Sequence, residues 1–143
     1  MKTKQIKELV HMVKNELNFD SDEAREMVLS LRDGENDFEV GNYRFISEDA
    51  IDEIMQDELS SDEYVLGCFT DWFLADVLDI DIDVIQAMQS ADAYEALGKL
   101  VISKGKLEEL QRQYVIADGY GHHFNHYDFN EWEAGGYYAF RID

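Results

Sequence analysis

The feature that most constrains this chain is a long stretch that is rich in carboxylates and has no cationic side chain. Residues 45–98, called here the acidic run, contain 15 Asp and Glu and no Lys or Arg. An ordinary surface intersperses both signs of charge to gain ion pairs between residues i and i+4, and this stretch forgoes such pairs. The flanks are nearly balanced, with 10 acids and 7 bases in residues 1–44 and 7 acids and 5 bases in residues 99–143. The acidic run therefore carries −15 of the net charge of −20.

The remaining composition is that of a folded protein. Of the 143 residues, 45% are hydrophobic and 13% are aromatic, whereas disordered acidic chains are poor in such residues. The chain has no proline, and no linker, low-complexity tract or internal repeat. We expect residues 1–143 to form a single domain.

Hydrophobic periodicity predicts an α+β fold that is mainly helical, with five to seven short helices. The helices are expected at 4–17, from about 20 to Gly34, and at 48–59, 62–78, 82–89, 91–103 and 106–116. The segment DFEVGNYRFI predicts a β-hairpin that turns at Gly41 and Asn42. Tyr138, Phe140 and Ile142 alternate with other residues and predict a closing strand or hairpin.

The segment 62–78 is apolar almost all round, which is typical of a central, buried helix. Because Cys68 lies on this most apolar helix, it is interpreted as an inert core thiol and not as a nucleophile. Asp71 and Asp76 are unusual on such a helix. We expect them on an exposed edge; the alternative is that they are buried with partners.

The acidic run supplies the candidate binding residues. In the segment 48–59, Ile51, Met55 and Leu59 fall on one side of the expected helix, which is capped by Ser47. The acids fall on the other side. If the neighbouring elements lie side by side, the domain has one strongly negative face that would contact a basic partner. The candidate contacts are Glu48, Asp49, Asp52, Glu53, Asp57, Glu58, Asp62, Glu63, Asp79, Asp81 and Asp83.

Motifs for catalysis or metal binding are weak. A calcium loop that starts at Asp79 would need Gly at its sixth position and Glu at its twelfth, where the chain has Val84 and Ser90. His122, His123 and His126 with Asp128 contain metal-binding residue types, but no HExxH or CxxC pattern accompanies them. Gly-rich nucleotide loops and the GxSxG motif are absent from the sequence. We therefore expect no enzyme activity, no cofactor and no metal.

The same features bear on location. The single cysteine excludes an intramolecular disulfide, and no apolar run approaches the roughly 20 residues of a membrane span. A negative surface is repelled by anionic lipids and by nucleic acid. These observations predict a cytoplasmic protein that binds neither membranes nor nucleic acid directly.

The C-terminal segment ADGYGHHFNHYDFNEWEAGGYYAFRID resembles a module of small phage and prophage proteins. The similarity rests on a D-G-x-G-H motif at 118–122, a Y-D pair at 127–128 and a final Y-Y-x-(Y/F)-R at 137–141. The overall acidic character is similar to that of phage-encoded DNA mimics, which inhibit restriction enzymes or CRISPR effectors. The resemblance implies a protein of the host cytoplasm.

Three hypotheses follow for the function. The first is a DNA mimic whose carboxylates replace phosphates opposite the Arg and Lys of a basic nucleic-acid-binding protein, such as a CRISPR effector or restriction enzyme. The second is a metal-binding or enzymatic phage accessory protein that uses the His-rich segment. The third is a structural or regulatory phage protein that self-associates through its C-terminal aromatic residues, for example as a homodimer.

Overall fold

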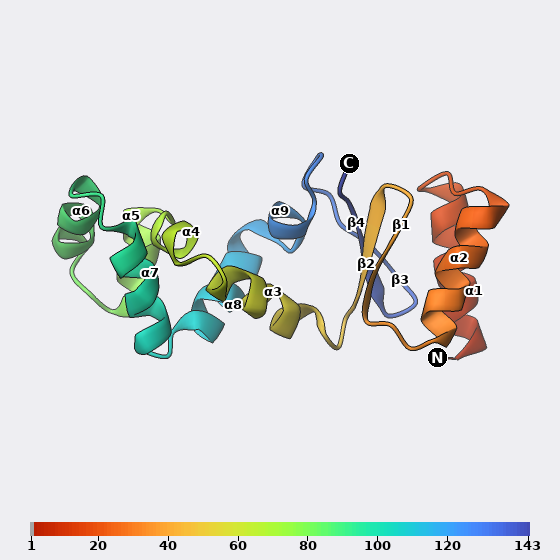
Figure 1. The fold of residues 1–143 in the computed structure, drawn as a ribbon, viewed down its shortest axis with the longest axis horizontal. Coiled ribbons are helices and arrows are strands. Elements are labelled where there is room, and N and C mark those ends of the chain that lie inside the picture. The colour runs from red at the N-terminus through yellow and green to blue at the C-terminus, as the bar shows by residue number, and fades with distance from the viewer. Residues whose placement is uncertain (1) are drawn as a thin grey trace. The chain divides into compact units, whose positions relative to one another are not determined.

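The computed structural model describes residues 2–143 and contains nine helices and four strands in that range (Figure 1). The chain groups into two compact units, which we call unit 1 (residues 1–51 and 118–143) and unit 2 (residues 52–117). The expected α+β, mainly helical class is confirmed.

Unit 1 is a four-stranded antiparallel sheet with helices on both faces. Its elements are α1 (Thr3–Asn15), α2 (Ser21–Arg32), β1 (Asp37–Val40), β2 (Tyr43–Ser47), α9 (Gly121–Phe124), β3 (Trp132–Ala134) and β4 (Tyr137–Arg141). The strand order is β1-β2-β4-β3. The predicted hairpin is confirmed, since β1 pairs with β2 across Gly41 and Asn42, and Gly41 has the positive φ that such a turn requires.

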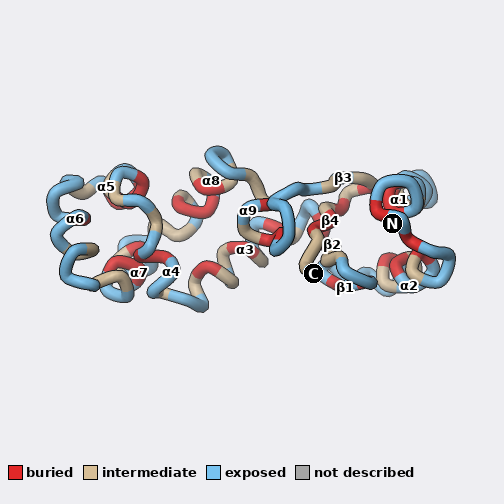
Figure 2. Tube along the Cα trace, turned by 90° about the horizontal axis from the view of Figure 1, so that it is seen from above, coloured by how far each residue is buried: buried red, intermediate tan, exposed pale blue. Residues whose placement is uncertain are grey.

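The strands of unit 1 alternate between two covered faces. On one face Phe45, opposite Ala139, packs into the core formed with α1 and α2. On the other face Phe140, opposite Arg44, contacts Phe124 of α9. Figure 1 shows α1 and α2 on one side of the sheet and α9 on the other, and Figure 2 shows buried residues along these elements. The C-terminal strand thus holds both layers together.

Unit 2 is helical throughout. Its elements are α3 (Ile51–Ser60), α4 (Glu63–Gly67), α5 (Asp71–Leu78), α6 (Ile82–Ser90), α7 (Tyr94–Ser103) and α8 (Leu107–Asp118). Two glycines allow α4 and α7 to pack backbone against backbone. A methyl group on Gly67 would overlap the carbonyl of Tyr94, and one on Gly98 would overlap the carbonyl of Glu63.

The prediction of one buried helix over 62–78 is wrong. The segment forms α4 and α5, separated by Cys68–Thr70, and Gln89 donates from Nε2 to the carbonyls of Gly67 and Phe69 at the break. The all-round apolar pattern arose because two short helices turn different sides to the core. Cys68 is exposed, which corrects its interpretation as a core thiol.

Other boundaries differ by a few residues. The helix expected at 48–59 begins only at Ile51, because residues 48–50 form a turn in which the Asp49 N–H donates to Ser47 Oγ at 3.3 Å. Asp76 is exposed, as expected for an edge, whereas Asp71 is half-buried and accepts from Gln86 Nε2 at 2.9 Å. Within residues 2–143 no helix is long and apolar enough to cross a bilayer.

Candidate binding surface

The eleven candidate carboxylates belong to both units. Glu48 and Asp49 lie in unit 1, directly after β2, and the other nine lie in unit 2. Glu58 and Glu63 are half-buried and the remaining nine are exposed. In unit 2 they come from α3, from the start of α4, from the connection between α5 and α6 and from the first turn of α6. Figures 1 and 2 show α3 and α6 at opposite ends of unit 2, so the carboxylates are distributed along it.

Several of these carboxylates stabilise the fold. Asp62 accepts the Val65 N–H at 3.2 Å and caps α4, and Asp81 accepts the Asp83 N–H at 3.0 Å at the start of α6. Asp52 accepts from Gln111 Nε2 at 2.8 Å, which joins α3 to α8. Capping places a carboxylate at the positive end of a helix, where it needs no cation.

Others act only through their charge. Glu63 Oε2 lies 3.9 Å from Lys99 Nζ, which also approaches Glu95, and this exposed pair contributes little to stability. Among the described residues, the side chains of Glu53, Asp57, Asp79 and Asp83 have no hydrogen-bonding or ion-pair partner. Asp79 ends α5 with a φ of 54°. These four carboxylates are available to an external cation.

Unit 1 has a separate carboxylate cluster beside β3. The side-chain hydrogen bond with Glu133 raises the pKa of Glu48 above 4.5, with smaller contributions from partial burial and from the charges of Glu133 and Asp49. Burial raises the pKa of Glu131, and the charge of Glu133 adds to this. Glu48 and Asp49 also line a polar cavity of about 350 Å³ together with Gln5.

Several residues of the C-terminal segment pack on one another in unit 1. The Arg141 guanidinium lies 3.6 Å from the centroid of the Tyr127 ring. Tyr120 packs on Tyr138 at 5.1 Å between ring centroids. A methyl group on Gly121 would overlap the Phe129 carbonyl, which explains why glycine is needed there. Packing therefore accounts for Gly121, Tyr138 and Arg141 of this pattern.

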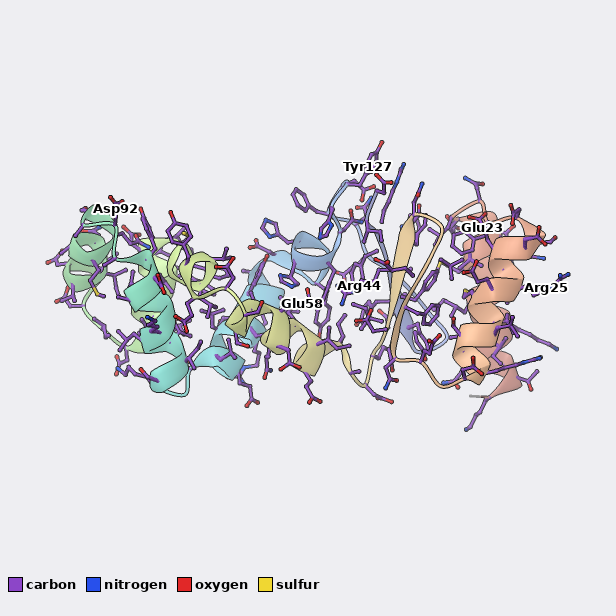
Figure 3. All side chains as sticks on the ribbon, in the orientation of Figure 1. Glu23, Arg25, Arg44, Glu58, Asp92 and Tyr127 are labelled. Carbon is purple, nitrogen blue, oxygen red and sulfur yellow. The ribbon has the colours of Figure 1, made fainter. Side chains whose placement is uncertain are left out.

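The loop between α9 and β3 is held by a buried asparagine. Asn125 is 1% exposed; its Oδ1 accepts the N–H groups of Tyr127 and Asp128, and its Nδ2 donates to the Asn130 carbonyl at 2.7 Å. Tyr127 and Phe129 are left 62% and 61% exposed, and Figure 3 shows Tyr127 projecting from the loop. Phe129 has a φ of 63°, which is uncommon for a bulky residue.

The three C-terminal histidines have different surroundings. His122 stacks on Phe129 with ring centroids 4.9 Å apart, and His123 lies edge-on to Phe124 at 4.6 Å. The His126 N–H donates to the Arg141 carbonyl. In residues 2–143 no three His, Cys, Asp or Glu side chains are arranged to hold a metal ion.

The sequence interpretation missed the exposed apolar residues of unit 2. Trp72 on α5 is 62% exposed, although the pattern placed it in the core. A shallow cavity of about 220 Å³ is lined by Val65, Cys68, Phe69 and Tyr114. Their exposure follows from the break after Gly67, which rotates α5 relative to α4 and leaves no signal in the apolar pattern of 62–78.

Comparison with known proteins adds no relative: no protein-family model, curated protein or solved structure matches the chain.

Proposed function

We propose that this chain is an acidic binding protein that occupies the nucleic-acid site of a basic protein. Its carboxylates would take the place of phosphates opposite Arg and Lys. The observation that carries this proposal is the exposure of the acidic run. Of its 13 carboxylates in unit 2, 10 are exposed, and none has a Lys or Arg from the same run beside it.

The number of carboxylates in unit 2 is close to the number of phosphates in a DNA duplex of the same length. A compact unit of residues 52–117 has a radius of gyration of about 11 Å, and hence a diameter of about 28 Å. B-DNA of that length carries about 16 phosphates, at one per ~1.7 Å. Unit 2 carries 15 carboxylates and only four Lys and Arg. An array of this density favours fast association that weakens strongly with salt.

The C-terminal resemblance suggests the biological setting. Similarity to a phage module favours a host-defence protein as the partner, either a CRISPR effector or a restriction enzyme. A phage gains when such an enzyme is blocked, and the nucleic-acid site of such an enzyme is a cationic cleft. The chain would act in the host cytoplasm as an inhibitor, without catalysis of its own.

The test is capture followed by competition. The immobilised full chain is incubated with bacterial lysate at low salt, and the captured proteins are challenged with a DNA duplex. We expect a nucleic-acid-binding protein to be captured, to be released by the duplex and to be lost at high salt. Capture of no basic protein, or a captured partner that holds duplex and chain together, would refute the mimicry.

A matched pair of variants locates the contact. The first removes the four carboxylates without structural partners, as Glu53→Gln, Asp57→Asn, Asp79→Asn and Asp83→Asn. The control removes four exposed acids of unit 1, as Glu16→Gln, Glu26→Gln, Asp33→Asn and Glu39→Gln. Both variants change the net charge by the same amount. Only the first should lose capture, and equal loss in both would show that net charge, and not the acidic run, attracts the partner.

A second candidate function is self-association through the loop after α9. The observation that favours it is the exposure of Tyr127 and Phe129, which the buried Asn125 fixes in place. Light scattering of the full chain would then report a dimer, and the double variant Tyr127→Ser, Phe129→Ser a monomer. A wild-type monomer at high concentration would reject this function.

A further inference from the structure

The solvent-facing side of α5 combines an aromatic ring with carboxylates. Trp72 and Asp76 are four residues apart, so they are neighbours on the helix surface, and both are exposed. Asp79 follows at the C-terminal end of the helix. The opposite side of α5 carries Phe73, Leu74, Val77 and Leu78, which are buried. The exposed side is therefore not required by the core of unit 2.

The Trp72 ring is held from one side. It contacts Phe73 edge-on, with ring centroids 6.1 Å apart. Phe73 stacks on Phe69 at 5.2 Å, and Phe69 contacts Tyr114 at 5.1 Å. At the helix start the Trp72 N–H donates to Asp71 Oδ1, while Asp71 Oδ2 accepts from Gln86 on α6. These contacts preorganise an exposed aromatic surface, which lowers the entropic cost of binding.

The charges around this ring differ from those around the aromatic residues of unit 1. The two cation–π contacts seen in residues 2–143 are Arg44 on Phe124 and Arg141 on Tyr127, and both lie in unit 1. The sequence from 45 to 98 has no Lys or Arg that could approach Trp72. The four cations of unit 2 lie elsewhere on the sequence: Lys99 lies beside Glu95, Lys104 donates to the Leu78 carbonyl at the C-terminal end of α5, Lys106 pairs with Glu109, and Arg112 is exposed on α8.

We propose that Trp72, together with Asp76, binds an arginine side chain of the cationic partner. The guanidinium would stack on the indole face while its N–H groups donate to the carboxylate. Arginine fits this pair better than lysine, because its planar group stacks on aromatic rings and donates in a fork. Charge complementarity identifies the occupant, since the surroundings are anionic. The inference rests on the proposed function, because it names a contact within that interface.

The experiment compares an oligoarginine with an oligolysine of equal length as calorimetric probes of the full chain at low salt. Oligoarginine should bind the wild type more tightly. Trp72→Leu should weaken oligoarginine binding about five-fold, the effect of one exposed or partly desolvated cation–π contact, and leave the oligolysine affinity unchanged. Tyr127→Leu is the control, because Tyr127 is equally exposed (62%) but already carries Arg141. It should bind both peptides as the wild type does.

The outcomes separate this inference from the proposed function. If neither peptide binds the wild type, the proposed function fails. If both bind and Trp72→Leu lowers both affinities equally or neither, the proposed function survives and the arginine site is refuted. If light scattering shows a wild-type dimer that Trp72→Leu dissociates, the surface belongs to a second copy of the chain and the arginine site is also refuted. Circular dichroism of each variant confirms that it is folded.

Discussion

Replacing Gly98 by alanine tests whether close helix contact organises unit 2. Gly98 lies within α7, where alanine is favoured over glycine by about 1 kcal/mol. Helix propensity alone therefore predicts a more stable protein. However, a Cβ at this position would lie 2.6 Å from the carbonyl carbon of Glu63 and 2.8 Å from its Cα. The Cβ would also overlap the Glu63 carbonyl oxygen, whereas ordinary contact requires 3.4–4 Å. The helices α4 and α7 would therefore have to separate by about 1.5 Å.

This separation should outweigh the gain in propensity. Overpacking typically costs about 1–3 kcal/mol, and the upper end applies here because the obstructing atoms are backbone and cannot change rotamer. The expected net loss is about 2 kcal/mol in the free energy of unfolding. Urea denaturation followed by circular dichroism measures it, under the linear extrapolation of the unfolding free energy.

Two comparisons make the Gly98→Ala result interpretable. Gly105→Ala introduces a methyl group into open space at a φ of +67°, so it should cost only the left-handed penalty of about 1 kcal/mol. Gly67→Ala should resemble Gly98→Ala, and the double variant should lose less than the sum, because the first substitution already separates the helices. A Gly98→Ala protein as stable as the wild type, or more stable, would refute the reasoning.

Three further predictions concern unit 1 and the charges. Asn125→Ala should lower the free energy of unfolding by about 1–2 kcal/mol, because the buried Asn125 side chain makes three hydrogen bonds to the backbone of the loop and these would be lost; thermal melts would measure it, and an exposed Asn130→Ala should lose less. The folded-state pKa of Glu48 is raised above 4.5, so this group stabilises unit 1 below pH 4.5 and the contribution is lost as the pH rises through the raised value. The Glu133→Gln variant should therefore have a higher free energy of unfolding than the wild type at pH 7, and this free energy should increase less when the pH is lowered. Equal dependence of the free energy of unfolding on pH in both proteins would contradict this. Added salt should raise the melting temperature, because it screens the repulsion between the carboxylates, and it should weaken partner binding. A melting temperature that does not change with salt would contradict this prediction.

The sequence predicted those elements whose signals are local. The Asp20–Glu23 pair forms the expected capping box of α2, with the Glu23 N–H donating to Asp20 Oδ1 at 2.8 Å. Gly41 and Asn42 fixed the hairpin because a two-residue turn needs a residue that tolerates positive φ. Both signals operate within four residues, so they are readable without knowledge of the tertiary contacts.

Features that depend on distant contacts could not be predicted. The break between α4 and α5 is stabilised by Gln89, about 20 residues away, and this contact leaves no pattern in the segment 62–78. From the sequence alone, Gly98 is only a residue of low helix propensity. The need for glycine there is visible only in the structure, where the Glu63 backbone approaches it. Of the candidate site, the exposed carboxylates were predictable from composition, whereas Trp72 was assigned to the core because periodicity cannot follow a helix that stops and restarts.

The base-free acidic run folds because backbone groups replace cations at several of its carboxylates. Asp62, Asp71 and Asp81 each lie at the start of a helix and accept a backbone N–H there. The positive ends of α4, α5 and α6 thus compensate part of the negative charge. A Lys or Arg of the chain would pair with an exposed carboxylate and make it unavailable to a partner. A helix N-terminus, in contrast, interacts only with the carboxylate that caps it. This arrangement is consistent with an interface whose charge is completed by a partner.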